Sequence, residues 1–284
     1  MPEDQATKLA RLQAAAAILA AGGCTINMDM GYIPGSFHTP TFNYGIYHES
    51  NIDITPHLTA TLGLRYDYSK VKIDYITSAA IKMDENVMGT HLSPVISSLL
   101  NHKESNHFDE FLPKVGLTYR LDNGSNFYAT WSKGYRSGGY NIQMFSDILQ
   151  SELSAQAQTA RADVDIQHDD AYYERIAKTI QFKPERSWNY EVGTHLNLFN
   201  NQLHVDIATF YMQIRNQQLS VMAGNYGFGR MMTNAGKSHS TGMELTARGA
   251  ALSNKLSYQL TYGFTSAEFD EYKDTLGNEA VDYK

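Results

Sequence analysis

The sequence contains a single cysteine, Cys24, so it forms no intrachain disulfide bond and no zinc site built from several cysteines. It has no apolar run of roughly 20 residues, the length that a transmembrane helix requires. Basic residues are in the minority, because 23 Lys and Arg stand against 30 Asp and Glu and give a net charge of -7. This charge, without any basic run, argues against nucleic acid as a partner. A membrane-spanning protein with this sequence would have to be a β-barrel.

Aromatic residues are biased towards tyrosine, with 19 Tyr against 12 Phe and 2 Trp. A tyrosine ring has an apolar body and a polar tip, which suits a boundary between water and an apolar phase. Mean hydropathy is low, at -0.40. Strands with one wet face and one apolar face would explain this value.

Residues 187–199 alternate between apolar and polar side chains without interruption, which predicts a β-strand. The Asn200-Asn201 pair tolerates the positive φ of a tight turn, and a second alternating segment begins at Leu203. One face of this hairpin is apolar, and the other carries carboxylates, amides and imidazoles. A packed soluble core would not accept that polar face without partners, whereas a water-filled lumen would.

The same alternation recurs along the chain and predicts about eight strands. Their connections alternate between short and long, and the two longest, residues 69–110 and 136–181, show no sustained strand period. The second of these contains helix-like stretches at residues 146–160 and 170–179. The chain is therefore predicted to be all-β, an antiparallel up-and-down transmembrane β-barrel with tight periplasmic turns and long extracellular loops. The apolar segment at Phe210, Met212 and Ile214 breaks the pattern and indicates either a bulge near Ala208 or a strand end above the membrane.

Three segments are expected. Residues 1–40 form a helical or irregular loop segment, residues 41–270 the transmembrane portion, and residues 271–284 a truncated extracellular loop. Within the first segment, residues 3–21 resemble an alanine-rich helix. Glu3 and Asp4 occupy the place of the basic region of a signal peptide, so a loop helix is the preferred interpretation.

Four stretches resemble strands of TonB-dependent outer-membrane receptors, in that family's order. They are TLGLRYDYS at residues 61–69, NFYATWSKGYRSGGYN at 126–141, FKPERSWNYEVG at 182–193 and TNAGKSHSTGMELTARG at 233–249. The resemblance implies a cell outer-membrane location and active uptake of a nutrient such as a ferric siderophore or another metal complex. It also implies energy from the TonB complex. The family has a barrel of about twenty-two strands, so about eight strands indicate an incomplete barrel and an internal fragment.

Six loop residues are candidate contacts to a small-molecule or metal-complex ligand. The alternative roles are solvated loop histidines, and anchors of the barrel in outer-membrane lipid and lipopolysaccharide. The candidates are Arg136, Tyr140, His102, His107, Tyr172 and Tyr173. No resident metal or cofactor is expected, because the histidine spacing, with His91 and His168 included, fits no tight ligand set.

Catalysis is not expected, since no Gly-x-Ser-x-Gly elbow is present and no catalytic residues can be assigned. The polar residues on the strands are expected to form a hydrated wall or a plug-facing surface, and they are Glu191, His195, Asp206 and Glu244.

Two alternatives stay open at this point. A self-contained barrel of about eight strands, acting as a structural protein or narrow pore, would pair its first strand with its last. A soluble, tyrosine-rich β-sandwich would bury the apolar face in a protein core. Pairing between residues 42–54 and 256–269 distinguishes a closed small barrel from part of a larger one.

Overall fold

The computed structural model describes residue 13 and residues 24–87, 90–222, 230–251, 255–276 and 279–283. Most of these residues lie in one sheet, antiparallel except where β9 joins it, whose order is β1-β4-β6-β7-β11-β12-β13-β14-β15, and β2, β3, β5 and β9 pair beside this path. The elements are β1 (Cys24–Met30), β2 (Gly35–His38), β3 (Thr41–Asp53), β4 (Leu58–Val87), β5 (Thr90–Leu92), β6 (Val95–Arg120), β7 (Asn126–Arg136), β8 (Gly139–Tyr140), α2 (Met144–Ala157), β9 (Val164–Ile166), α3 (Asp170–Ile180), β10 (Gln181–Phe182), β11 (Glu185–Leu198), β12 (Leu203–Met222), β13 (Arg230–Ala251), β14 (Leu256–Leu276) and β15 (Glu279–Tyr283).

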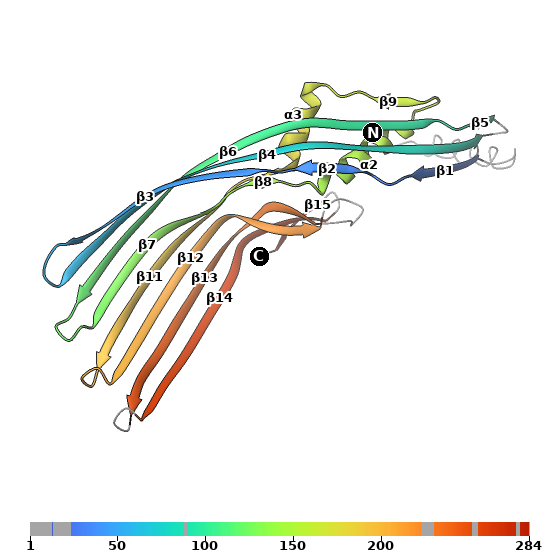
Figure 1. The fold of residues 1–284 in the computed structure, drawn as a ribbon. Helices are drawn as coiled ribbons and strands as arrows, with labels where there is room; N and C mark the ends of the chain where they lie inside the picture. Colours follow the sequence, from blue (N-terminus) through green and yellow to red (C-terminus); the bar gives the residue numbers. More distant parts are fainter. Residues whose placement is uncertain are drawn as a thin grey trace. The chain divides into compact units, whose positions relative to one another are not determined.

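The chain divides into two compact units, which are described separately. The first unit comprises residues 1–38, 73–104 and 142–179, and the second comprises residues 39–72, 105–141 and 180–284. In the second unit, successive strands lie side by side and are joined by short turns at one end (Figure 1). This is the antiparallel up-and-down arrangement predicted from the sequence.

The β11–β12 hairpin forms as its alternating pattern predicts. Its strands pair without a register shift from Arg186 opposite Arg215 to Leu198 opposite Leu203. Asn200 and Asn201 have φ values of 53° and 66°, the left-handed conformation that asparagine tolerates. A bulge near Ala208, one of the two alternatives for this segment, is absent from this described pair, and the register shifts of β12 lie between Arg215 and Gln218. Phe210 therefore lies on the polar face, where its ring packs against Gly242 on β13. A side chain at position 242 would collide with this ring, because a Cβ there would come within 2.4 Å of it.

The two faces of the sheet differ in chemistry. We define the apolar face as the one that carries Leu117, Val192 and Phe264, whose exposed fractions are 48%, 56% and 56%. The polar face carries the side chains that alternate with these, including Thr118 and Glu191. Large exposed apolar side chains on one face of an antiparallel sheet are typical of a surface that meets lipid.

The sheet is not closed within the described residues. There, β3 pairs with β4 alone, and β14 pairs with β13 and β15, so no ladder joins residues 42–54 to residues 256–269. The alternative of a closed, self-contained small barrel is therefore wrong for this structure. An incomplete barrel agrees with the open sheet.

In the first unit, the expectation of an irregular segment over residues 69–110 is wrong, because most of it belongs to β4 and β6. Apolar side chains change face along β4. Leu62 and Leu64 are exposed at even positions, and farther along the buried side chains are at odd positions, namely Val71, Ile73, Tyr75, Ala79, Ile81 and Met83. The reason is a change of surroundings, since the odd face of this extension packs against protein rather than facing water.

Helix α2 supplies that packing surface. Its buried side chains recur every fourth residue and so lie on one face of the helix: Phe145, Leu149, Leu153 and Ala157. The Phe145 ring lies 4.4 Å from the ring of Tyr75 on β4 and 5.2 Å from that of Phe37 on β2. Both helix-like stretches predicted from the sequence are confirmed by α2 and α3.

Several short strands were not predicted. β1 and β2 both pair with β4 within residues 1–40, and β9 pairs with β6 in a parallel direction. The helix expected over residues 3–21 lies outside the described residues, apart from Gln13. Neither described helix is long and apolar enough to cross a membrane.

Candidate functional site

Two of the six candidate ligand contacts, His102 and Tyr173, touch each other in the first unit. The imidazole of His102, on β6, stacks on the ring of Tyr173, on α3, with centroids 4.3 Å apart and planes inclined by 13°. The ring of Tyr75, on β4, meets His102 edge-on at 6.4 Å. The result is a half-buried aromatic surface built from two strands and a helix.

Glu152, on α2, is the centre of a hydrogen-bond network that sequence reasoning missed. Its Oε2 accepts a bond of 2.7 Å from Ser98 Oγ on β6, its Oε1 lies 2.7 Å from His168 Nε2, and the Tyr172 hydroxyl also bonds it. The side chain of His168 is only 3% exposed. Burial, with the Glu152 carboxylate beside it, raises the pKa of Tyr172 above its ordinary value, so the hydroxyl stays protonated and keeps donating. Ser98 thus holds α2 to β6, and His168 and Tyr172 hold the start of α3 to α2.

Glu152→Gln is expected to loosen α2 and α3. The amide keeps the size of the side chain but offers one acceptor oxygen instead of two, and a buried donor left unpaired costs about 1 to 3 kcal/mol. Hydrogen–deuterium exchange of the backbone amides of α2 and α3 should become correspondingly faster. Glu174→Gln, on the exposed side of α3, is the matched control and should leave exchange unchanged. Unaltered exchange in Glu152→Gln would show that the network does not hold the helices.

Three further candidates, His107, Arg136 and Tyr140, lie in the second unit and are not gathered into one place. The ring of His107 stacks on Tyr68 at 5.8 Å. Arg136 is exposed at the end of β7, opposite Glu185, and Tyr140 belongs to the short β8–β10 pair. Of the six candidates, the structure brings His102 and Tyr173 into a stack, and the ring of Tyr172 meets that of Tyr173 edge-on, with centroids 6.2 Å apart.

The polar face of the second unit is a wall of paired polar groups. Tyr128 donates a hydrogen bond of 2.9 Å to Glu191. Asp206 lies 2.7 Å from His195 Nδ1 and 3.6 Å from a guanidinium nitrogen of Arg248. Within the described ranges, no group of three His, Cys, Asp or Glu side chains is placed to hold a metal ion. This arrangement fits the hydrated wall expected from the sequence.

Glu110 forms an ion cluster that sequence reasoning also missed. Lys133, on β7, donates to its Oε1, and Arg186, on β11, donates to its Oε2 at 2.6 Å. The side chains of Glu110 and Lys133 are only 9% and 17% exposed. The partners are 23 and 76 positions away in the sequence, so only the strand order reveals that they meet.

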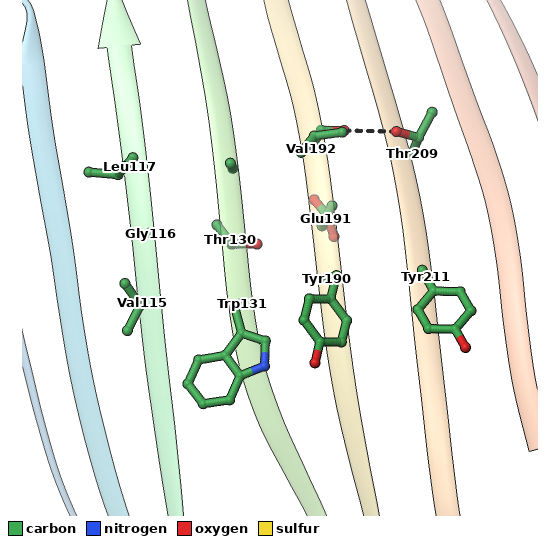
Figure 2. Close-up of a pocket in the computed structure, with 11 residues that line it drawn as sticks. Val115, Gly116, Leu117, Thr130, Trp131, Tyr190, Glu191, Val192, Thr209 and Tyr211 are labelled. Carbon is green, nitrogen blue, oxygen red and sulfur yellow. Dashed lines mark hydrogen bonds between the residues drawn. The ribbon is translucent and has the colours of Figure 1, made fainter. Parts of the chain in front are cut away.

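A hollow of about 490 Å³ lies on the apolar face of the second unit, over β6, β7, β11 and β12 (Figure 2). Strand pairing places four of its side chains opposite one another in a single row, namely Val115, Trp131, Tyr190 and Tyr211. Leu117 and Val192 lie in the next row towards the short turns. The walls of the hollow are thus mainly apolar and aromatic.

An antiparallel sheet with one apolar face, one polar face, and alternating short and long connections defines a transmembrane β-barrel of the outer-membrane class. A family model described as "TonB dependent receptor-like, beta-barrel" matches residues 21–282. The chain therefore belongs to the TonB-dependent receptor β-barrel family. This is a family of receptors rather than of enzymes, and its β-barrels are outer-membrane proteins.

Among curated proteins, the chain is similar to the pesticin receptor of Yersinia enterocolitica serotype O:8 / biotype 1B. They are 24% identical over 219 residues, which is 77% of this chain and 25% of that receptor. The chain thus spans about a quarter of the length of the curated relatives it matches. Among solved structures, it is similar to the ferric yersiniabactin uptake receptor FyuA from Yersinia pestis, with 18% identity and a TM-score of 0.40 over 91% of this chain and 38% of that one. It is also similar to the siderophore receptor PiuA from Acinetobacter baumannii, with 13% identity and a TM-score of 0.44 over 87% and 41%.

Proposed function

We propose that this chain forms part of an outer-membrane receptor for active uptake of a nutrient such as a ferric siderophore or another metal complex. The observation that carries the proposal is the family match over residues 21–282, on a sheet with one apolar and one polar face. In this proposal residues 41–270 carry the membrane-crossing part. The apolar face meets outer-membrane lipid and lipopolysaccharide, and an inner-membrane TonB complex supplies the energy.

The loops bind the ligand in this proposal. The stacked rings of His102 and Tyr173 offer a flat aromatic surface on the first unit. Arg136 is exposed on the second unit and offers a cation to an anionic ligand, with Tyr140 and His107 as further contacts. Tyr172 contributes to ligand binding only indirectly in this proposal, because its hydroxyl already forms a hydrogen bond with Glu152.

Uptake of 55Fe-labelled siderophores tests the proposed function. We expect iron-limited cells that carry the protein to accumulate label from at least one of a catecholate, a hydroxamate and a phenolate complex. Cells that lack the protein, or that lack the TonB complex, should not accumulate label from that complex. His102→Ala and Tyr173→Ala should reduce uptake, because each removes half of the aromatic stack. Lys103→Ala is the matched control, since Lys103 is next to His102 but forms an exposed ion pair with Asp74.

Equal accumulation with and without the protein, for all three complexes, would contradict siderophore uptake. Accumulation that persists without the TonB complex would contradict the proposed energy source. A normal rate in both aromatic variants would remove His102 and Tyr173 from the ligand site.

A further inference from the structure

Three cationic side chains lie directly opposite one another on neighbouring strands. Arg186 on β11 pairs with Arg215 on β12, and Arg215 pairs with Lys237 on β13. Like charges that face each other across strands destabilise a sheet. A row of three on one face therefore requires anions close by.

Two of these cations have a carboxylate partner among the described residues and the third does not. Arg186 binds Glu110 at 2.6 Å, and Lys237 binds Glu271 at 2.7 Å. Arg215 is exposed and, among the described residues, has no carboxylate within ion-pair distance. Its protein contacts are a long hydrogen bond of 3.5 Å to Gln213 and the ring of Trp188. Most of its donors are thus directed at the surroundings of the protein.

The unpaired cation lies next to the hollow on the apolar face. Trp188 is two residues beyond Tyr190 on the same face of β11, on the side of the long connections. Its ring lies 5.1 Å from the guanidinium carbon of Arg215 and 5.9 Å from the ammonium of Lys133. Rings followed by cations on a lipid-facing surface are typical of the boundary between hydrocarbon and headgroups.

Acidic side chains surround the other end of this row. On β14, Asp270 lies 2.6 Å from His239 Nδ1, Glu268 faces His239 across the strands, and Glu271 binds Lys237. At the β11 and β12 end of the row, cations therefore outnumber carboxylates on the apolar face. Within the part of the chain that the structure describes, Glu110 on β6 is the carboxylate partner of both Lys133 on β7 and Arg186 on β11, and Arg215 on β12 has no carboxylate within ion-pair distance.

We infer that Arg215, beside Arg186, binds a phosphate group of a phosphorylated glycolipid in the outer leaflet, with an acyl chain of that lipid in the adjacent hollow. The guanidinium fork matches phosphate oxygens, and the apolar hollow favours a lipid over a free phosphate ion. The inference rests on the proposed function in one respect, namely that the apolar face meets the outer membrane. It adds a site for membrane lipid to a protein whose proposed ligand binds at the loops.

The test is native mass spectrometry of the protein extracted from outer membranes in detergent, stripped of lipid and then titrated with bisphosphorylated lipid A. We expect Arg215→Gln to weaken binding about tenfold or more, the effect of losing a charge-assisted hydrogen bond. Arg248→Gln is the matched control, because Arg248 is an arginine on the polar face and should not affect lipid A binding. Arg215→Lys should restore part of the affinity, which a purely structural role would not predict. Heat-dependent gel mobility verifies that each variant is folded.

Three outcomes would overturn the inference. One is equal binding of lipid A by Arg215→Gln and the unmodified protein, and another is equal binding of dephosphorylated lipid A. The third is complete displacement of lipid A by inorganic phosphate, which would assign the site to a free anion. Siderophore uptake is measured in a separate experiment. Absence of uptake together with normal lipid A binding would contradict the proposed function but not the lipid site.

Discussion

Replacing Glu110 by glutamine is expected to lower the free energy of unfolding by about 3 to 5 kcal/mol, because it leaves two partly buried cations without their carboxylate. Lys133 and Arg186 both bind this one side chain, and the Lys133 side chain is only 17% exposed. Neither cation has another carboxylate partner among the described residues. The neutral amide keeps the volume of the side chain, so the loss reports charge rather than packing. Denaturant titration of the protein in phospholipid vesicles measures the change.

Glu49→Gln is the control for this experiment. Glu49 binds Lys114 at 2.9 Å, but both side chains are 45% exposed, and such an exposed pair contributes about 0 to 1 kcal/mol. The two variants make the same chemical change in the same unit and differ in burial. If both lowered the free energy of unfolding equally, burial of the Glu110 cluster would not be the cause.

The barrel part of the fold could be predicted from the sequence because each strand there has one polar face and one apolar face. Because of this difference, apolar and polar residues alternate along residues 187–199, and the Asn200-Asn201 pair marks the turn that comes next in the chain. Strand order also followed, since short turns join neighbouring strands. The face of each residue on β11 was fixed by the same alternation.

The loop part could be predicted only in pieces. Both helix-like stretches, at residues 146–160 and 170–179, could be predicted, and in α2 the buried residues Phe145, Leu149 and Leu153 recur every fourth residue. The extensions of β4 and β6 were missed although Val71 to Met83 alternate, because the apolar positions change from even to odd along β4 and interrupt the pattern. That change depends on α2 covering the strand, which is a tertiary fact.

The polar networks could not be predicted from the sequence, because their members are far apart in the chain. Ser98 is on β6, Glu152 is on α2 and His168 is in the loop before α3, at separations of 54 and 16 residues, and no local pattern relates them. The same holds for Glu110 and its two cations. Among the candidate ligand contacts, residue type alone selected His102 and Tyr173, and only the packing of α3 on β6 shows that they stack.

Leu117→Arg is expected to destabilise the barrel by about 2 to 4 kcal/mol, the effect of a charged side chain on the lipid face near the middle of the bilayer. Leu117 is 48% exposed on the apolar face of β6 and lies between the aromatic row at Val115 and the strand end at Arg120. Its arginine would have to lose its hydration or distort the bilayer. Denaturant titration in phospholipid vesicles again measures the effect.

Thr118→Arg tests whether the two faces are assigned correctly. Thr118 is the next residue of the same strand but lies on the polar face, opposite Tyr128, whose hydroxyl binds Glu191. An arginine there stays hydrated and lies near a carboxylate, so the free energy of unfolding should change little. Equal losses of unfolding free energy for Leu117→Arg and Thr118→Arg would mean that the two faces do not differ in their surroundings as a membrane-spanning sheet requires. That result would contradict the assignment of this sheet to a membrane. A large loss at Leu117 alone requires a sheet with lipid on one side and water on the other, which is the physical condition for every functional proposal made for this chain.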